Sequence, residues 1–334
     1  MLAELSNLRG VSGNEELVRQ YLIEKLGQGG CDYTVDTMGN LLAYKNCVNR
    51  KGSIMLSAHM DEVGLMVVSI NKQGLLYFKQ VGGIDNRVLI AKRVRVGDSG
   101  LPGVIGSKPI HLQKKGEQNK PFDEDTLYID CGFKNREQAE KEINIGDYVT
   151  FDTNCESLGD GFCRGKAFDD RAGCLVILNL LLKDNNCSFC AAFTVQEEVG
   201  TRGALTAAYT LEPHTALVIE TTAASDTPGT EKEQITTALG KGPAISFMDS
   251  TVMVKKEMRD ELVNAAESAG VPYQFRQFTG SGTEAGVISL SREGVQTAVL
   301  SIPCRYIHSP QGIIQEKDII AAENLVESWL ESKQ

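Results

Sequence analysis

The spacing of apolar residues predicts an α/β core. Apolar runs of strand length alternate with segments whose apolar residues recur at helical spacing, and this alternation favours a largely parallel sheet. The expected strands cover residues 33–35, 41–44, 54–59, 190–196, 215–220 and 297–302, and the expected helices cover 173–182, 256–269 and 316–330. We therefore predict a mostly parallel central sheet flanked by helices.

The first helix has its own start signal. Ser12 and Glu15 have the S-x-x-E spacing of a capping box, and apolar residues follow on one helical face at 17, 18, 21, 22 and 26. This pattern predicts that Ser12 caps a helix, which Gly29 and Gly30 end.

A different pattern fills the middle of the chain. Between about residues 64 and 162, short alternating runs are separated by glycine-bearing turns, with little helical periodicity. This pattern is typical of a small β-rich domain inserted into another domain. We predict a discontinuous α/β domain over 1–62 and 164–334, and an inserted β-rich domain over 63–163.

Composition and charge narrow the range of partners. The 334 residues include 34 Lys and Arg against 44 Asp and Glu, a formal net charge of −10 that makes nucleic acid an unsuitable partner. No apolar run approaches the ~20 residues of a membrane span, so no membrane is expected. The first residues lack the pattern of a secretory signal, and a cytoplasmic protein is predicted.

Acidic residues and histidines gather where the expected strands end. His59 and Asp61 end one strand, Glu197 and Glu198 follow another, and Glu220 ends a third. The remaining candidates are His308, which follows the last strand, and Asp169, which precedes a helix. Because the ligand crevice of an open α/β sheet lies at the carboxyl ends of its strands, these side chains are expected at one edge.

Two imidazoles with several carboxylates suit Zn²⁺ or a similar divalent ion better than Ca²⁺ or Mg²⁺. The carboxylates are too many for one tetrahedral ion, so two metals sharing a bridging carboxylate are expected. Of the adjacent pair Glu197 and Glu198, one could bind metal while the other moves protons. Each motif alone is weak, and the prediction depends on their coincidence. His111 and His214 fall outside strand ends and are expected at the surface.

Seven segments together resemble the tetrahedral aminopeptidases, dinuclear metallopeptidases related to glutamyl aminopeptidase and sometimes described as cellulase-like. They cover nearly the whole chain: GVSGNE at 10–15, AHMDEVG at 58–64, VGGI through GVIGSKPIH at 81–111, GKAFDDRAG at 165–173, VQEEVG at 195–200, SDTPG at 225–229 and RYIHSP at 305–310. Together these motifs are highly specific.

The resemblance implies a role for each candidate. His59 would bind one metal, Asp169 would bridge both, and Glu198 and His308 would bind the second. Glu197 would be the general base and Asp61 would orient His59. Zn²⁺ or Co²⁺ are the expected ions, two per chain.

Two positions depart from the pattern of the family. Glu220 stands where the family usually has aspartate as the remaining ligand of the first metal. Glu284 stands where the family commonly has the aspartate of Gly-Thr-Asp, and is expected to reshape the wall of the substrate site.

The function predicted is a metal-dependent aminopeptidase that releases N-terminal residues from short peptides by attack of a metal-bridging hydroxide. Two alternatives are a non-peptide amide hydrolase or deacylase on the same fold, and a non-catalytic metal-binding assembly subunit. A cellulase is disfavoured, because glycosidases use two carboxylates that flank an acetal and need no set of histidines and metals. Aromatic residues that could stack on a sugar are also few, with one Trp and 6% aromatic residues in all.

The preferred N-terminal side chain is left open. A preference for acidic residues would need a cationic pocket, for which Arg171, Arg202, Arg276 and Arg305 are candidates. The resemblance also implies a homo-oligomer, a tetrahedral dodecamer built from dimers, with the inserted domain as its contact or gating element. A plain dimer is the alternative.

Overall fold

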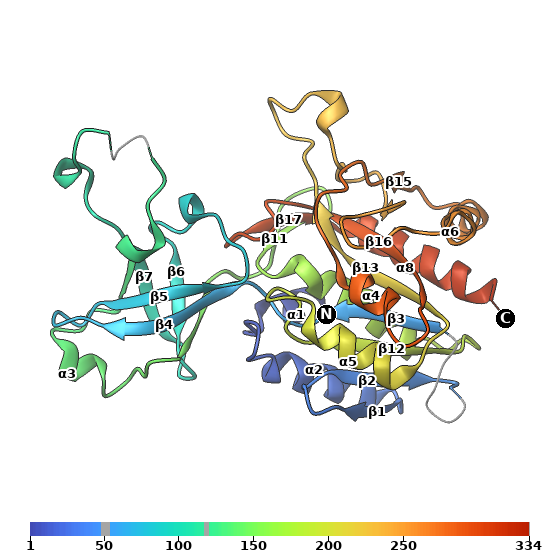
Figure 1. Cartoon of the computed structure of the whole chain (residues 1–334), viewed down its shortest axis with the longest axis horizontal. Coiled ribbons are helices and arrows are strands. Elements are labelled where there is room, and N and C mark those ends of the chain that lie inside the picture. Colours follow the sequence, from blue (N-terminus) through green and yellow to red (C-terminus); the bar gives the residue numbers. More distant parts are fainter. Residues whose placement is uncertain (48–53, 117–119, 334) are drawn as a thin grey trace.

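The computed structural model describes residues 1–47, 54–116 and 120–333. It shows an α/β body and a separate small β-barrel (Figure 1). Both parts were predicted from the sequence, and the domain boundaries at 62/63 and 163/164 stay a prediction.

The α/β body is built on an 11-stranded sheet with nine strands in the order β1-β2-β12-β3-β13-β16-β17-β11-β10. The central strands β12, β3, β13 and β16 are parallel, and the flanking pairs on the main path are antiparallel. The strands of this path are β1 (Asp32–Val35), β2 (Leu41–Lys45), β3 (Ile54–His59), β10 (Glu156–Ser157), β11 (Phe162–Gly165), β12 (Phe189–Thr194), β13 (Thr215–Ala223), β16 (Gln296–Arg305) and β17 (Gly312–Gln315). The short strands β14 (Ala244–Ile245) and β15 (Gln274–Phe275) pair beside β16.

Helices cover both faces of this sheet. Buried residues of one core cluster come from α1 (Leu2–Asn7), α2 (Glu16–Gln28), α4 (Phe168–Leu182), α6 (Lys256–Ala269) and α8 (Glu316–Glu331). The cluster on the opposite face draws on α5 (Arg202–Leu211) and α7 (Glu284–Ser289). Because helices cover both faces, β3 and β12 are buried along their whole length. Strands buried on both faces have largely apolar sequences without alternation, as these two do.

The barrel closes in the order β4-β5-β8-β7-β6-β9 around its own apolar core. Its strands are β4 (Gly64–Ile70), β5 (Leu76–Val81), β6 (Arg93–Val96), β7 (Leu101–Gly106), β8 (Tyr128–Asp130) and β9 (Tyr148–Phe151), with the short helix α3 (Arg136–Ala139) beside them. Each of the six strands pairs with two others, although β5 and β8 meet at only one residue pair, Leu76 and Ile129. No helix in the described residues is long and apolar enough to cross a membrane.

The predicted capping box is wrong. Helix α2 begins at Glu16, and no side chain caps it. The Ser12 hydroxyl instead donates to Asp61 Oδ2 at 2.6 Å, and Glu15 Oε1 accepts from the backbone N–H groups of Gly13 and Gln196. Both polar side chains therefore serve long-range or loop contacts that the local pattern does not show.

A buried ion pair lies where the chain enters the barrel. Glu62 precedes β4, and its carboxylate contacts Lys166 Nζ at 2.7 and 2.8 Å. Both side chains are 3% exposed. Lys166 Nζ also donates to Leu8 O, and Glu62 Oε1 accepts from Gly10 N, so the pair joins three separate segments.

Candidate metal centre

The fold brings the predicted acids and histidines to one end of the central strands. His59 is the last residue of β3, and Glu197 and Glu198 follow β12. Glu220 lies within β13, which continues to Ala223 rather than ending at Glu220. His308 follows β16, and Asp169 lies in the first turn of α4.

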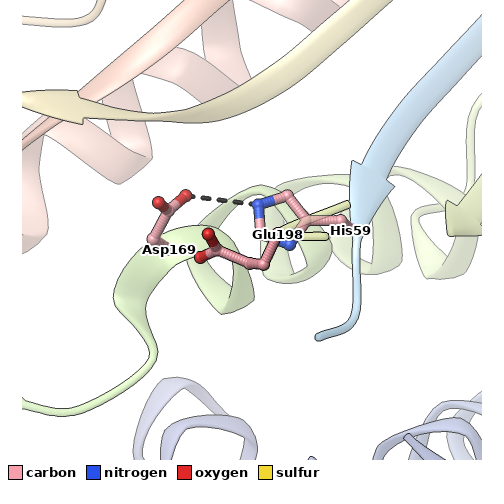
Figure 2. A group of neighbouring side chains, drawn as sticks. All are labelled: His59, Asp169 and Glu198. Atoms are coloured by element: carbon pink, nitrogen blue, oxygen red, sulfur yellow. Dashed lines mark ion pairs between the residues drawn. The ribbon is translucent and has the colours of Figure 1, made fainter. Parts of the chain in front are cut away.

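Asp169 lies between the two histidines. His59 Nε2 is 3.3 Å from Asp169 Oδ1, and His308 Nε2 is 3.1 Å from Asp169 Oδ2 (Figure 2 shows the His59 side). Each oxygen of one carboxylate thus faces a different imidazole. This arrangement can place one carboxylate between two cations.

Glu198 completes a group of possible ligands. Ligand atoms of His59, Asp169 and Glu198 all lie within 4.8 Å of one another (Figure 2). Glu198 Oε2 is also 3.4 Å from His308 Nε2. The described contacts do not include a hydrogen bond or ion pair of Glu220 with this group. Glu220 is 7% exposed, and the charges of Asp169 and Glu197 act on its carboxyl group.

Asp61 organises the segment around His59. Its carboxylate is fully buried and accepts the backbone N–H of Glu197 at 3.0 Å and that of Glu198 at 3.1 Å. Its Oδ1 is also 3.5 Å from His59 Nδ1, and its carbonyl oxygen is 3.2 Å from the same nitrogen. Asp61 therefore contacts the ring of His59 and the backbone of both acids that follow β12. Ser12, which donates to Asp61, is a further supporting residue that sequence reasoning missed, although it lies in one of the matching segments.

The site holds more acid than its imidazoles can neutralise. Burial raises the pKa of Glu197 to about 7 and that of Glu198 to about 8, and it raises the pKa of Glu220 well above its ordinary value. Among the described residues, no Lys or Arg forms an ion pair with these three acids. An excess of buried carboxyl groups over the cations beside them favours a ligand of positive charge.

The pKa values of the two histidines are raised as well, by the acids beside them. Burial is the largest single effect on His308 and opposes its charge, yet the hydrogen bond with Asp169 and the charges of Glu198, Asp169 and Glu197 together raise the pKa of His308 to about 9. The pKa of His59 is raised in the same way against its burial, by Asp169 and Asp61. Two imidazoles with several carboxylates form a donor set that fits Zn²⁺ or Co²⁺.

The backbone around these side chains is unusual. Ala167 (φ 53°), Gln196 (φ 56°) and His308 (φ 53°) adopt the left-handed region that non-glycine residues rarely occupy. Such conformations persist where the surrounding structure holds them, and they cluster at functional sites. All three positions are at, or within two residues of, a candidate ligand or base.

The four candidate arginines have different surroundings. Arg171 is fully buried, and its guanidinium donates to Met60 O and Leu5 O, while Arg305 pairs with Asp226 through two contacts of 2.7 Å. Arg202 donates to Gln196 Oε1 at 3.3 Å. Arg276 is 4% exposed and donates to Ser281 Oγ, and its charge lowers the pKa of Glu220 against the larger effect of burial. The structure therefore does not define a cationic substrate pocket. His111 and His214 are exposed, as predicted.

Comparisons with known proteins agree with one another. The model of the M42 glutamyl aminopeptidase family matches residues 39–325. A protein of Acetivibrio thermocellus that is named as an aminopeptidase is 37% identical over 98% of this chain and 96% of its own length. Among solved structures, an aminopeptidase from the archaeon Desulfurococcus kamchatkensis superposes with a TM-score of 0.92 at 36% identity, covering 99% of this chain and 96% of that one.

A second structure bears on assembly. The TET1 peptidase of Pyrococcus horikoshii, which can assemble into a tetrahedron or a large octahedral shell, has a TM-score of 0.87 at 31% identity. The match covers 98% of this chain and 97% of that chain.

Proposed function

The chain belongs to the M42 glutamyl aminopeptidase family, a family of peptidases, and from this premise we propose that it is a dinuclear metal-dependent aminopeptidase acting on short peptides. One observation carries the metal part of the proposal. The two oxygens of Asp169 face His59 and His308 separately, at 3.3 and 3.1 Å. A bridging carboxylate between two metals needs this arrangement.

The proposed ligand set is the one that the resemblance to the family implies, and the positions of His59, Asp169, Glu198 and His308 support it. His59 and Glu220 would hold one ion, Glu198 and His308 would hold the other, and Asp169 would bridge them. Zn²⁺ or Co²⁺ fit this donor set. Glu220 lies in the sheet beside the cluster, and its side chain is one methylene longer than aspartate. The proposal for Glu220 therefore has less geometric support than that for Asp169.

When bound, the metals would polarise the scissile carbonyl and lower the pKa of an attacking water. Glu197 would take the proton of that water and deliver it to the leaving amine. Asp61 would hold Glu197 in place through the backbone N–H that it accepts, and would fix the ring of His59.

A free N-terminal amine should be required for cleavage. An aminopeptidase recognises this amine, so a short peptide should be cut one residue at a time and its N-acetylated form should remain intact. Chromatography of both peptides with the metal-loaded enzyme measures this difference. N-acyl amino acids belong in the same assay, because hydrolysis of these substrates, or of the acetylated peptide, would favour the deacylase alternative. Membership of a peptidase family speaks against the non-catalytic alternative.

We also propose a homo-oligomer, specifically a tetrahedral dodecamer built from dimers. Support comes from the fold shared with the P. horikoshii peptidase and from a barrel that supplies none of the proposed ligands. Closed symmetric assemblies are common among homo-oligomers. Sedimentation or light scattering of the metal-loaded protein should give the mass of twelve chains, and a mass of one or two chains would exclude this assembly. A cytoplasmic location also stays a proposal, supported by the sequence alone.

A further inference from the structure

Glu284 is a buried acid directly beneath the proposed centre. It begins helix α7 and is 1% exposed. Its Oε2 accepts a hydrogen bond of 2.7 Å from Ser57 Oγ, and its Oε1 accepts one from Thr194 Oγ1. Both hydroxyl-bearing residues are fully buried, so these bonds are shielded from water. The sequence-based expectation that Glu284 shapes the wall of a substrate site does not agree with this position.

The two donors belong to neighbouring parallel strands. Ser57 precedes His59 by two residues on β3, so both side chains lie on the same face of the sheet. Thr194 ends β12 and lies opposite His59 in the register of the two strands. It also precedes Glu197 by three residues. One carboxylate therefore connects the two strands just before the residues that they present to the centre.

The surroundings of Glu284 offer no other role for its carboxyl group. Within the described residues, no Lys or Arg forms an ion pair with it, and its near burial keeps it from direct contact with a substrate. The Thr283 hydroxyl, by contrast, accepts from Ala285 N at the start of α7 and donates to Asp249 at 2.8 Å. The two adjacent residues therefore have different contacts: Thr283 caps helix α7, and Glu284 contacts strands β3 and β12.

We propose that Glu284 is a positioning residue of this peptidase, whose carboxyl group fixes the Ser57 and Thr194 side chains at the ends of β3 and β12 and so supports the positions of His59 and Glu197. The proposal rests on the proposed function, since it assigns Glu284 to that centre. Side chains that orient ligands from outside the metal's own shell contribute about 10–100-fold to metal affinity or activity. Glu284 contacts none of the proposed ligands directly and would act on them through Ser57 of β3 and Thr194 of β12.

The test compares three variants of the full-length, Co²⁺-loaded protein. Glu284→Leu keeps a similar volume and removes both acceptors, so we expect kcat to fall about tenfold or more, with weaker Co²⁺ binding and a changed Co²⁺ absorption spectrum. KM should change little. Glu284→Gln can still contact both hydroxyls, because a hydroxyl accepts as well as donates, and it should recover most of the activity. Thr283→Val serves as the matched control: it should lower Tm and leave kcat and the spectrum unchanged.

Three results would overturn the proposal. These are an unchanged kcat and spectrum in Glu284→Leu, a Gln variant no better than the Leu variant, and a Thr283→Val variant that loses as much activity for the same fall in Tm. If Glu284→Leu does not fold, Ser57→Ala removes one of the two bonds and is judged by the same readouts. If the wild-type protein cleaves no peptide, the proposed function fails, while the Co²⁺ titration and spectrum still decide whether Glu284 positions His59.

Discussion

Replacing Glu197 with glutamine is expected to lower kcat by about 10²–10⁴-fold while the protein keeps both metals, because general-base catalysis contributes that much. The amide preserves the size of the side chain and the backbone N–H that Asp61 accepts, and it removes only the proton acceptor. Steady-state kinetics on a short peptide and elemental analysis of the same preparation measure the two effects together.

The companion variant for this experiment is Glu293→Gln, which makes the same chemical change at an exposed position outside the centre. It should match the wild-type protein in both measurements. A Glu197→Gln enzyme that keeps more than about a tenth of the wild-type kcat would show that Glu197 is not the base, since even weak general-base catalysis exceeds that factor.

The second large effect is expected at Asp169. Asparagine has nearly the same shape, but it is neutral and offers only one oxygen acceptor, so it cannot serve two ions. Asp169→Asn should therefore lose metal from both positions and lose activity with it. Elemental analysis after dialysis gives the number of ions per chain, and circular dichroism confirms that the fold is retained.

His308→Ala provides the contrast for Asp169→Asn. This change removes a proposed ligand of one ion only, so the variant should keep about one metal per chain, as expected when ligands are divided between two ions. Two ions per chain in Asp169→Asn would contradict the bridging role. Equal losses in both variants would show that the two ions do not bind separately.

Much of the α/β body could be predicted because its elements follow simple periods. The helix expected over 256–269 has those bounds in the structure, and β3 ends at His59 as predicted. Strand β7 was not predicted because Pro102, Gly103 and Gly106 within it resemble turn residues. Barrel pairing with β6 and β8 determines its conformation instead. Helix α5 was also missed, although its apolar residues recur at helical spacing, and its buried positions are mostly small residues.

The candidate metal centre was predictable from the sequence where a histidine or an acidic residue lies at the end of a strand. His59, Glu197 and Glu198 lie at or just after the ends of buried strands, and a sequence shows such positions directly. The supporting contacts are different in kind. Ser57 and Glu284 are 227 residues apart in the chain, and no local period connects them. The role of Ser12 was mistaken for the same reason, because a local capping pattern concealed a contact 49 residues away.

The ion pair of Glu62 and Lys166 restricts which substitutions the chain can tolerate during evolution. Glu62 stands between Asp61 and the first barrel strand, and Lys166 lies three residues before Asp169. Removing one partner would leave the other charge buried without its ion pair, at a cost of about 3–5 kcal/mol. Arg171, 3.8 Å from Glu62, would be the cation that remains beside Glu62 if Lys166 were removed. Domains are typically stable by only about 5–15 kcal/mol, so a substitution at one position would rarely survive alone. Positions 62 and 166 should therefore be inherited together, and a barrel transplanted from a relative over residues 63–163 would leave this pair intact, because both partners belong to the α/β domain.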